Sequence, residues 1–192
     1  MANEFYALLG RMRYITRWGL MRNTFSENIQ EHSHQVAVLA HALALIRRDV
    51  LKLDGPDPDK CAVAALYHDA SEILTGDLPT PIKYYNPDIK VAYKQVERIA
   101  GERLLAMLPE QLRKSYEDLV LEDYDVQTLA VVKAADKLSA YIKCIEEQKA
   151  GNTEFDSAEQ LTMKALKQMA LPELDWFIAE CLPAFALNLD QL

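Results

Sequence analysis

Four residues of this sequence could together hold a metal ion. His68 and Asp69 follow the apolar run Cys61–Tyr67, while His32 lies 36 residues before this pair and Asp136 lies 67 residues after it. His32 and Asp136 lie on apolar helical faces where a core residue is expected, and a buried imidazole or carboxylate must be hydrogen-bonded, paired or bound to a metal. Two histidine nitrogens and two aspartate oxygens suit a divalent first-row transition ion, with coordination positions left for water and substrate.

The helical period places His32 on the same face as Val36 and Leu39, so its side chain points toward the core. His34 and His41 lie roughly 200° and 180° away around the same helix, so they cannot share an ion with His32. Two alternatives remain at these positions: His32 as a hydrogen-bonded core histidine, and Asp136 as half of a buried salt bridge. The convergence of two imidazoles and two carboxylates on the interior favours the metal.

Glu72 is the candidate for proton transfer. It lies four residues after His68, and the two side chains are neighbours if the helix continues for another turn. A carboxylate beside a metal-bound water is what general acid–base hydrolysis needs. A solvated residue at the end of a helix explains the spacing equally well.

Two further segments could bind a substrate. Arg17 can grip a phosphate with two parallel hydrogen bonds, and the indole of Trp18 can cover a sugar or base. The stiff loop Asp77-Leu78-Pro79-Thr80 offers a carboxylate, a hydroxyl and exposed backbone that could read hydroxyl groups. The structural alternatives are a surface charge beside a core anchor for the first segment and a proline-rich loop without a binding role for the second.

Composition limits the class of protein. With 192 residues, half of them hydrophobic, the chain suits one globular domain spanning residues 1–192. The net charge of −8 argues against general binding to nucleic acid or an anionic membrane. The three cysteines have no C-x-x-C spacing, which favours reduced thiols in the cytoplasm over disulfides or a zinc knuckle. Neither a secretory signal nor an apolar run long enough to span a bilayer is evident.

Helical periodicity runs through nearly the whole chain, and no alternating strand pattern is bounded by hairpin signals. The pattern therefore predicts an all-α fold. The expected helices span residues 4–14, 28–48, 58–68 (with Asp57 as N-cap), 87–107, 109–121 and 125–149, then a helix to residue 169 behind a capping box at 153–156, and a last one from residue 172.

The order His32, His68-Asp69, Asp136 resembles the H…HD…D signature of the HD-domain phosphohydrolases. More narrowly, the chain resembles the bacterial 5′-deoxynucleotidases of the YfbR type within that superfamily. The resemblance covers nearly the whole length. It is carried by the segments Arg17–Asn23, Glu31–Ser33, Gln35–Ala37, Ala40–Leu43, Tyr67–Glu72, Leu74–Pro81, Lys83-Tyr84, Lys133–Asp136, Ala140-Tyr141 and Ala150–Asn152. Gly19, where a proline is expected, and His34, where an apolar residue is expected, depart from the pattern.

The resemblance implies an HD-domain helical bundle and a role for each candidate residue. Glu72 would be the catalytic acid/base, and Arg17 would orient the phosphate. One divalent ion (Co, Mn, Zn, Cu or similar) would be held by His32, His68, Asp69 and Asp136. The sugar and base would be bound by Trp18, Asp77, Leu78, Pro79 and Thr80, with Asp69 and Asp136 also close to the substrate. The family is commonly homodimeric.

These expectations converge on a metal-dependent enzyme that hydrolyses deoxyribonucleoside 5′-monophosphates, a small-molecule nucleotide substrate. Trp18 would form an apolar wall against the 2′ position of the sugar, and Asp77 would accept a hydrogen bond from the 3′-hydroxyl. The alternatives are another HD phosphohydrolase, acting on a nucleoside triphosphate, cyclic nucleotide or guanosine tetraphosphate, and a non-catalytic nucleotide-binding helical domain. The presence of Glu72 and Arg17 beside the ligands argues against the non-catalytic alternative.

Overall fold

The structure is a computed structural model that describes residues 3–79 and 86–192. Within these ranges the fold is all-α, as predicted: the backbone forms helices and no β-strand, apart from an isolated bridge between Thr16 and Asn28. The α-helices are α1 (Phe5–Leu9), α2 (Ile29–Leu45), α3 (Pro58–Tyr67), α4 (Glu72–Thr75), α6 (Pro87–Ala106), α7 (Glu110–Val120), α8 (Val126–Lys149), α9 (Asp156–Gln168) and α10 (Pro172–Glu180). None of the described helices is long and apolar enough to cross a membrane.

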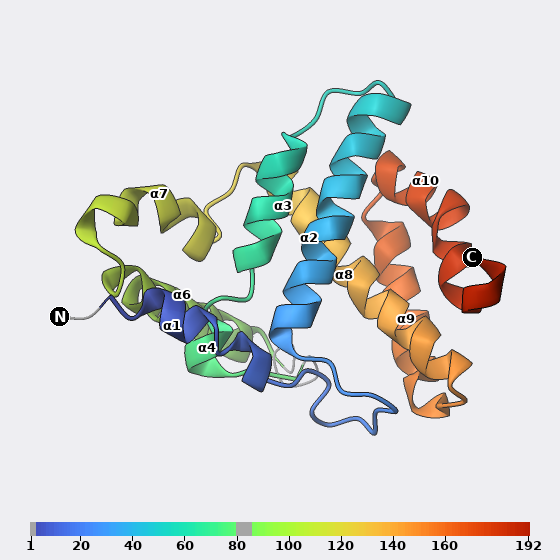
Figure 1. The fold of residues 1–192 in the computed structure, drawn as a ribbon, viewed down its shortest axis with the longest axis horizontal. Helices are drawn as coiled ribbons and strands as arrows, with labels where there is room; N and C mark the ends of the chain where they lie inside the picture. Colours follow the sequence, from blue (N-terminus) through green and yellow to red (C-terminus); the bar gives the residue numbers. More distant parts are fainter. Residues whose placement is uncertain (1–2, 80–85) are drawn as a thin grey trace.

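Figure 1 shows how the helices are arranged, and they pack around two apolar cores. The larger core joins α2, α3 and α8 and is closed by α9 and α10. The smaller core lies among α1, α6 and α7, and Phe5 and Leu104 are fully buried in it. The turn between α3 and α4 connects them, because Ala65 belongs to the larger core and Ala70 to the smaller one. His68 and Asp69 therefore lie at the junction of the two cores.

Local capping signals set the helix starts that matter for the site. Asn28 caps α2 in a capping box with Glu31, and the Asp57 side chain accepts from the backbone of Lys60 at the start of α3. Asp125 caps α8 by accepting from the backbone N–H groups of Gln127 and Thr128. These caps place His32 in the first turn of α2 and Asp136 in the middle of α8.

The structure differs from the predicted helices at several ends. Helix α3 ends at Tyr67, one residue before the predicted end, and the chain turns before α4 begins. The predicted first helix divides into α1 and a 3₁₀ turn at Met12–Tyr14, and α2 passes into a π-helical turn at Ile46–Val50. The predicted ends at residues 14, 48 and 68 therefore lie beyond the ends of the α-helices. The chain nevertheless remains helical to residue 14 in part as a 3₁₀ turn, and to residue 50 as a π-helical turn.

The predicted capping box at 153–156 is wrong. Thr153–Phe155 forms a 3₁₀ turn whose cap is Asn152, and α9 begins only at Asp156. The physical reason is the burial of Phe155, which is fully inaccessible to solvent. Placing that ring in the interior requires the chain to turn before the helix starts.

Candidate metal and substrate site

Three elements bring the predicted metal ligands together. His32 comes from α2, His68 and Asp69 from the turn after α3, and Asp136 from α8. One ligand atom from each of His32, His68 and Asp136 can be chosen so that all three lie within 4.8 Å of one another. His32 Nε2 lies 3.1 Å from Asp136 Oδ1. Residues separated by up to about a hundred positions in the sequence thus face one small volume.

Asp69 completes this group from the side of the turn. Its Oδ2 lies 3.2 Å from His68 Nε2 and 3.6 Å from His32 Nε2. The two histidines are 1% and 9% exposed, whereas the Asp136 side chain is 39% exposed. The group is therefore closed on the histidine side and open to solvent past Asp136, where a substrate could enter.

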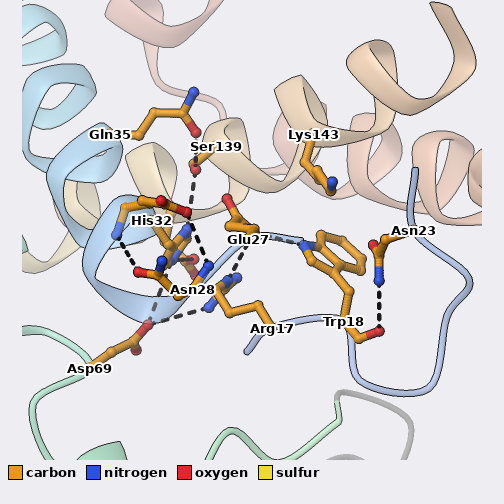
Figure 2. A network of polar contacts seen from close by, with 12 residues as sticks. Arg17, Trp18, Asn23, Glu27, Asn28, His32, Gln35, Asp69, Ser139 and Lys143 are labelled. Atoms are coloured by element: carbon orange, nitrogen blue, oxygen red, sulfur yellow. Dashed lines mark hydrogen bonds and ion pairs between the residues drawn. The ribbon is translucent and has the colours of Figure 1, made fainter. Parts of the chain in front are cut away.

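Each histidine presents Nε2 to the centre because its Nδ1 is already engaged. His68 Nδ1 lies 2.7 Å from the carbonyl oxygen of Ala65, which can only accept, so Nδ1 carries the proton. His32 Nδ1 lies 3.2 Å from Ser139 Oγ, and the Ser139 hydroxyl donates to Gln35 Oε1 at 2.6 Å (Figure 2). The serine proton is committed to Gln35, so His32 Nδ1 donates and Nε2 faces the centre of the group.

These donors fit a divalent transition metal. Both Nε2 atoms are buried and make no hydrogen bond within the described part of the chain. Neutral imidazoles whose other nitrogen donates to a fixed acceptor are the usual ligands of such ions. Nitrogen and carboxylate oxygen donors together suit Zn²⁺ and its first-row neighbours. The alternatives of a hydrogen-bonded core histidine at His32 and a buried arginine partner at Asp136 fit this geometry less well.

The electrostatics of the group favour a cation at its centre. Burial alone would lower the pKa of His68, but the carboxylates of Asp69 and Asp136 outweigh it and raise that pKa to about 10. Burial would raise the pKa of Asp136, yet the neighbouring histidines lower it to about 2. The same neighbours and Arg17 hold the pKa of Asp69 well below its ordinary value. A positive charge is therefore stabilised here, whether a proton or a metal supplies it.

The other two histidines of the chain, His34 and His41, lie away from this group, as the helical geometry predicts. His34 is exposed, and His41 Nε2 pairs with Asp59 Oδ1 at 3.4 Å on the surface. Both lie on α2 with His32, but neither belongs to the cluster of ligand atoms.

Arg17 is attached directly to a metal-ligand candidate. Its Nη1 lies 3.3 Å from Asp69 Oδ2, and its Nε lies 3.3 Å from Glu27 Oε2. Burial lowers the pKa of Arg17, but the surrounding carboxylates Asp69, Asp136, Glu27 and Asp77 outweigh it and raise that pKa. The guanidinium thus carries a fixed positive charge beside the cluster. Within residues 3–79 and 86–192, its Nη2 makes no hydrogen bond that would occupy it.

Trp18 adopts the left-handed backbone conformation, with φ of 59°, which is uncommon for a residue with a bulky side chain. Its indole N–H donates to Glu27 Oε2 at 2.8 Å, and its ring lies 5.3 Å from the buried ring of Phe155. Figure 2 shows the indole N–H held by Glu27, and the contact with Phe155 packs the ring against the core. Arg17 and Trp18 are not merely a surface charge beside an anchor.

Glu72 begins α4 and is only 5% exposed. The predicted reason for its proximity to His68, a continuous helix, is wrong because α3 ends at Tyr67. The turn instead returns the chain, and the Glu72 N–H donates to the carbonyl of Asp69 at 3.0 Å. A buried carboxylate therefore follows the ligand pair by one tight turn rather than lying at a solvated helix end.

The loop that follows α4 is partly buried over Asp77, Leu78 and Pro79. It leaves the helix through Gly76, whose φ of 75° is a conformation that favours glycine. The charge of Asp77 contributes to the raised pKa of Arg17, so the two side chains share one electrostatic environment. Thr80, the last predicted residue of this loop, lies outside the described residues.

The structure also shows functional neighbours that the sequence did not single out for a role: Glu27, Ser139 and the buried pair Lys143–Glu147. The Lys143 ammonium donates to Glu147 Oε1 at 2.5 Å and to the carbonyl of Phe25 at 2.8 Å. Glu27 precedes the Asn28 cap, and Ser139 follows Asp136 by three positions in α8. In the sequence, these positions are marked only by a polar residue within an otherwise apolar segment. Such a position does not identify the residue that the side chain contacts.

Comparison with known proteins agrees with this geometry. A family model described as 5′-deoxynucleotidase YfbR-like matches residues 4–185. The chain is 47% identical to a 5′-deoxynucleotidase of Vibrio atlanticus over 99% of this chain and 98% of that protein. It is 48% identical to a 5′-deoxynucleotidase of Erwinia tasmaniensis over 99% of this chain and 96% of that one.

Solved structures share the fold at lower sequence identity. A crystal structure of an HD-domain phosphohydrolase from Listeria innocua aligns with a TM-score of 0.83 and 19% identity, covering 97% of this chain and 90% of that one. An HD phosphohydrolase of cyanophage S-2L, bound to dA and one catalytic Zn²⁺ ion, aligns with a TM-score of 0.66 and 21% identity, covering 92% and 95%. The predicted HD-domain fold is therefore confirmed.

The family model matches nearly the whole chain, and two bacterial 5′-deoxynucleotidases are almost half identical to it over nearly their full length. As the resemblance predicted, this chain belongs to the YfbR-like 5′-deoxynucleotidase family.

Proposed function

We propose that this protein is a metal-dependent 5′-deoxynucleotidase that hydrolyses deoxyribonucleoside 5′-monophosphates to deoxynucleoside and phosphate. The observation that carries this proposal is the convergence of two buried Nε2 atoms with aspartate oxygens beside the Arg17 guanidinium. Within the described ranges these two nitrogens make no hydrogen bond and only face the carboxylates. A cation site next to a fixed arginine is suited to a dianionic phosphate group.

The metal ion would be held by His32, His68, Asp69 and Asp136. When bound, a divalent ion polarises phosphoryl oxygens and lowers the pKa of coordinated water. Zn²⁺ is supported by the ion in the cyanophage relative and by the donor set, and Co, Mn or Cu suit the same donors. Because the pKa of metal-free His68 is raised to about 10, metal binding at neutral pH displaces a proton from it.

The protein side chains would divide the hydrolysis between them. Arg17 would bind two phosphoryl oxygens and hold the phosphorus in line with the attacking water. Glu72 would act as general base toward that water and as general acid toward the departing 5′-oxygen, so that the P–O5′ bond breaks as the new P–O bond forms. The burial of Glu72 supports this role, because it limits exchange of the proton with bulk solvent.

The sugar and base would lie against Trp18 and the loop Asp77, Leu78, Pro79 and Thr80. Glu27 holds the indole N–H of Trp18, and the ring packs beside Phe155. The apolar face of this fixed ring supports a role as a wall against a 2′-hydroxyl. An apolar wall rejects an added hydroxyl by only about 10²-fold, so the expected result is a preference for deoxyribose over ribose. The dA bound by the cyanophage relative supports a deoxynucleoside in this fold.

Phosphate release from metal-stripped protein, with divalent ions restored one at a time, tests the proposal. The substrates are deoxyribo- and ribonucleoside 5′-monophosphates, 3′-monophosphates, nucleoside triphosphates, cyclic nucleotides and guanosine tetraphosphate. We expect several deoxyribonucleoside 5′-monophosphates to be hydrolysed, with weaker action on the ribonucleotides and little on the rest. Full activity without metal would contradict the metal assignment, and faster turnover of a triphosphate or cyclic nucleotide would favour a different HD phosphohydrolase.

We further propose that the protein is a cytoplasmic homodimer. An exposed stripe on α6 supports self-association, since Ala92, Val96 and Ile99 recur at helical spacing on one face and none is covered. Cys61 and Cys144 are buried free thiols, and burial raises their pKa to about 11 and about 12, which suits a reducing compartment. Light scattering coupled to gel filtration should give a mass of two chains, and Ile99→Asp should reduce it to one.

A further inference from the structure

One carboxylate joins the phosphate-binding candidate to the sugar-binding candidate. Glu27 Oε2 accepts from Arg17 Nε at 3.3 Å and from the indole N–H of Trp18 at 2.8 Å (Figure 2). The Glu27 side chain is 11% exposed, and the backbone carbonyl of Glu27 also accepts from the Arg17 N–H at 2.9 Å. The main chain and the side chain of Glu27 thus both hold Arg17, and its side chain also holds Trp18.

The guanidinium of Arg17 is fixed at two of its edges. Glu27 holds Nε, and Asp69 holds Nη1. A planar group restrained at two different nitrogens has a defined plane as well as a defined position. Without Glu27, only the single contact to Asp69 would remain among these pairs, and the guanidinium could rotate about it.

Trp18 needs its partner for a different reason. Its left-handed backbone is strained for a residue with a bulky side chain and persists only where the surroundings enforce it. The indole N–H bond to Glu27 is a charge-assisted hydrogen bond, which is stronger than a neutral one. The Trp18 carbonyl is held separately, by the Met21 N–H at 2.9 Å and by Asn23 Nδ2 at 3.4 Å, so Glu27 is the partner that fixes the polar edge of the indole.

We propose that Glu27 is a positioning residue that orients the Arg17 guanidinium and the Trp18 indole together, and so couples phosphate alignment to recognition of the sugar. This inference rests on the proposed function of Arg17 and Trp18 and adds the group that coordinates them. Its consequence is that one substitution away from the metal ligands should alter both the rate of phosphate release and the preference for deoxyribose.

The test is Glu27→Gln, which keeps the shape of the side chain and removes its charge. An amide oxygen still accepts, but the bond to the Trp18 indole becomes a neutral one and the ion pair with Arg17 is lost. For a deoxyribonucleoside 5′-monophosphate we expect kcat to fall about 10-fold or more, as for loss of a hydrogen bond to a charged group. The deoxy-to-ribo ratio of kcat/KM should narrow by at least about threefold, while metal content and Tm stay unchanged.

A spectroscopic measurement tests the orientation without using activity. The chain has two tryptophans, so a ¹H–¹⁵N spectrum contains two indole N–H resonances, and Trp176→Phe assigns them. An indole N–H bonded to a carboxylate resonates downfield, and Glu27→Gln should move the Trp18 resonance upfield without moving that of Trp176. Because this readout needs no substrate, it holds even if the proposed enzymatic function fails.

Glu154→Gln is the matched control. Glu154 also accepts from an arginine of the same segment, Arg22, at 2.7 Å, but the Arg22 side chain is 91% exposed. Such an exposed pair contributes little, so this variant should behave like the unmodified protein in kcat, in sugar preference and in the Trp18 resonance. An unchanged Trp18 resonance in Glu27→Gln, or a loss of rate with an unchanged sugar ratio, would overturn the proposed coupling.

Discussion

At the scale of single residues, the site depends on which nitrogen of each histidine is protonated. His32 and His68 both donate from Nδ1, to a hydroxyl that is itself committed and to a main-chain carbonyl. The metal-binding nitrogen is thereby selected before any ion arrives. We therefore expect Ser139, which is fully buried, to influence the metal affinity of the site.

Ser139→Ala should weaken metal binding about 10- to 100-fold, because it removes the acceptor that holds His32 Nδ1–H. Competition against a chromogenic chelator measures the affinity directly. Ser33→Ala is the matched control, since Ser33 is also buried on the His32 helix but its hydroxyl makes no hydrogen bond within the described residues. Equal losses in the two variants would contradict a specific role for Ser139.

Glu72→Gln should lower kcat on the order of 10²-fold or more, the usual scale for general acid–base catalysis. Metal content, measured by elemental analysis, should be unchanged, because Glu72 is placed outside the ligand set. Glu117→Gln, which alters an exposed carboxylate on α7, serves as the control. If metal is lost in proportion to activity, Glu72 is a ligand and its assignment as acid/base is wrong.

At the scale of elements, helix α8 both supplies Asp136 and anchors the segment that carries Arg17 and Trp18. About two and three turns further along, Lys143 and Glu147 form a buried pair, and their exposed fractions are 1% and 0%. Glu147 accepts from the backbone and hydroxyl of Thr24 at 2.9 and 2.7 Å and from Asn152 at 2.8 Å. The loop before α2 is therefore fixed to the helix that carries Asp136, one of the candidate metal ligands.

Glu147→Ala should destabilise the protein by about 3 kcal/mol or more, because it leaves the Lys143 ammonium buried without its counter-ion. Urea unfolding measures this loss. The neighbouring Glu146→Gln should cost little, because burial raises the pKa of Glu146 and its charge is not strongly stabilised. A loss in Glu147→Ala no larger than that in Glu146→Gln would contradict the anchoring role.

The same pair gives the protein a dependence on acid. Burial alone would raise the pKa of Glu147, but its hydrogen bonds from Lys143, Asn152 and Thr24 lower it from 4.5 to about 2. A folded-state pKa below the unfolded one stabilises the protein above about pH 4.5, and this contribution is lost as the pH falls toward 2. The difference in unfolding free energy between the unmodified protein and Glu147→Gln should therefore shrink over that interval. A constant difference would contradict it.

At the scale of the whole molecule, the candidate ligands join elements that belong to both cores. The turn carrying His68 and Asp69 lies between the core of α2, α3 and α8 and the core of α1, α6 and α7. An ion bound at this junction would fix the positions of the two cores relative to each other. The catalytic site and the stability of the fold should therefore respond to the same ion.

Chelation should lower Tm as well as activity. A metal at 100 times its dissociation constant stabilises the folded state by about 2.7 kcal/mol, which corresponds to roughly 5–10 °C for a protein of this size. Differential scanning fluorimetry with and without restored Zn²⁺ measures the shift. His32→Ala should show no shift with Zn²⁺, whereas the surface variant His41→Ala should retain it. A metal-induced shift in His32→Ala would contradict the ligand assignment.

The sequence by itself determined the features that depend on neighbouring residues. The caps at Asn28, Asp57 and Asp125 act within three positions, and the period of 3.6 residues already separates His32 from His34 and His41. The four ligand candidates also follow from the sequence, because each is a polar residue at a position where an apolar one is expected.

Only the tertiary structure decided how these parts meet. Glu27 contacts Trp18 across 9 positions, Ser139 contacts His32 across 107, and Glu147 contacts Thr24 across 123. Such partners are selected by how helices pack, and periodicity within one helix carries no information about the residue that faces it from another. The same reason explains the wrong capping box at Thr153, where burial of Phe155 against distant elements overrides a local signal.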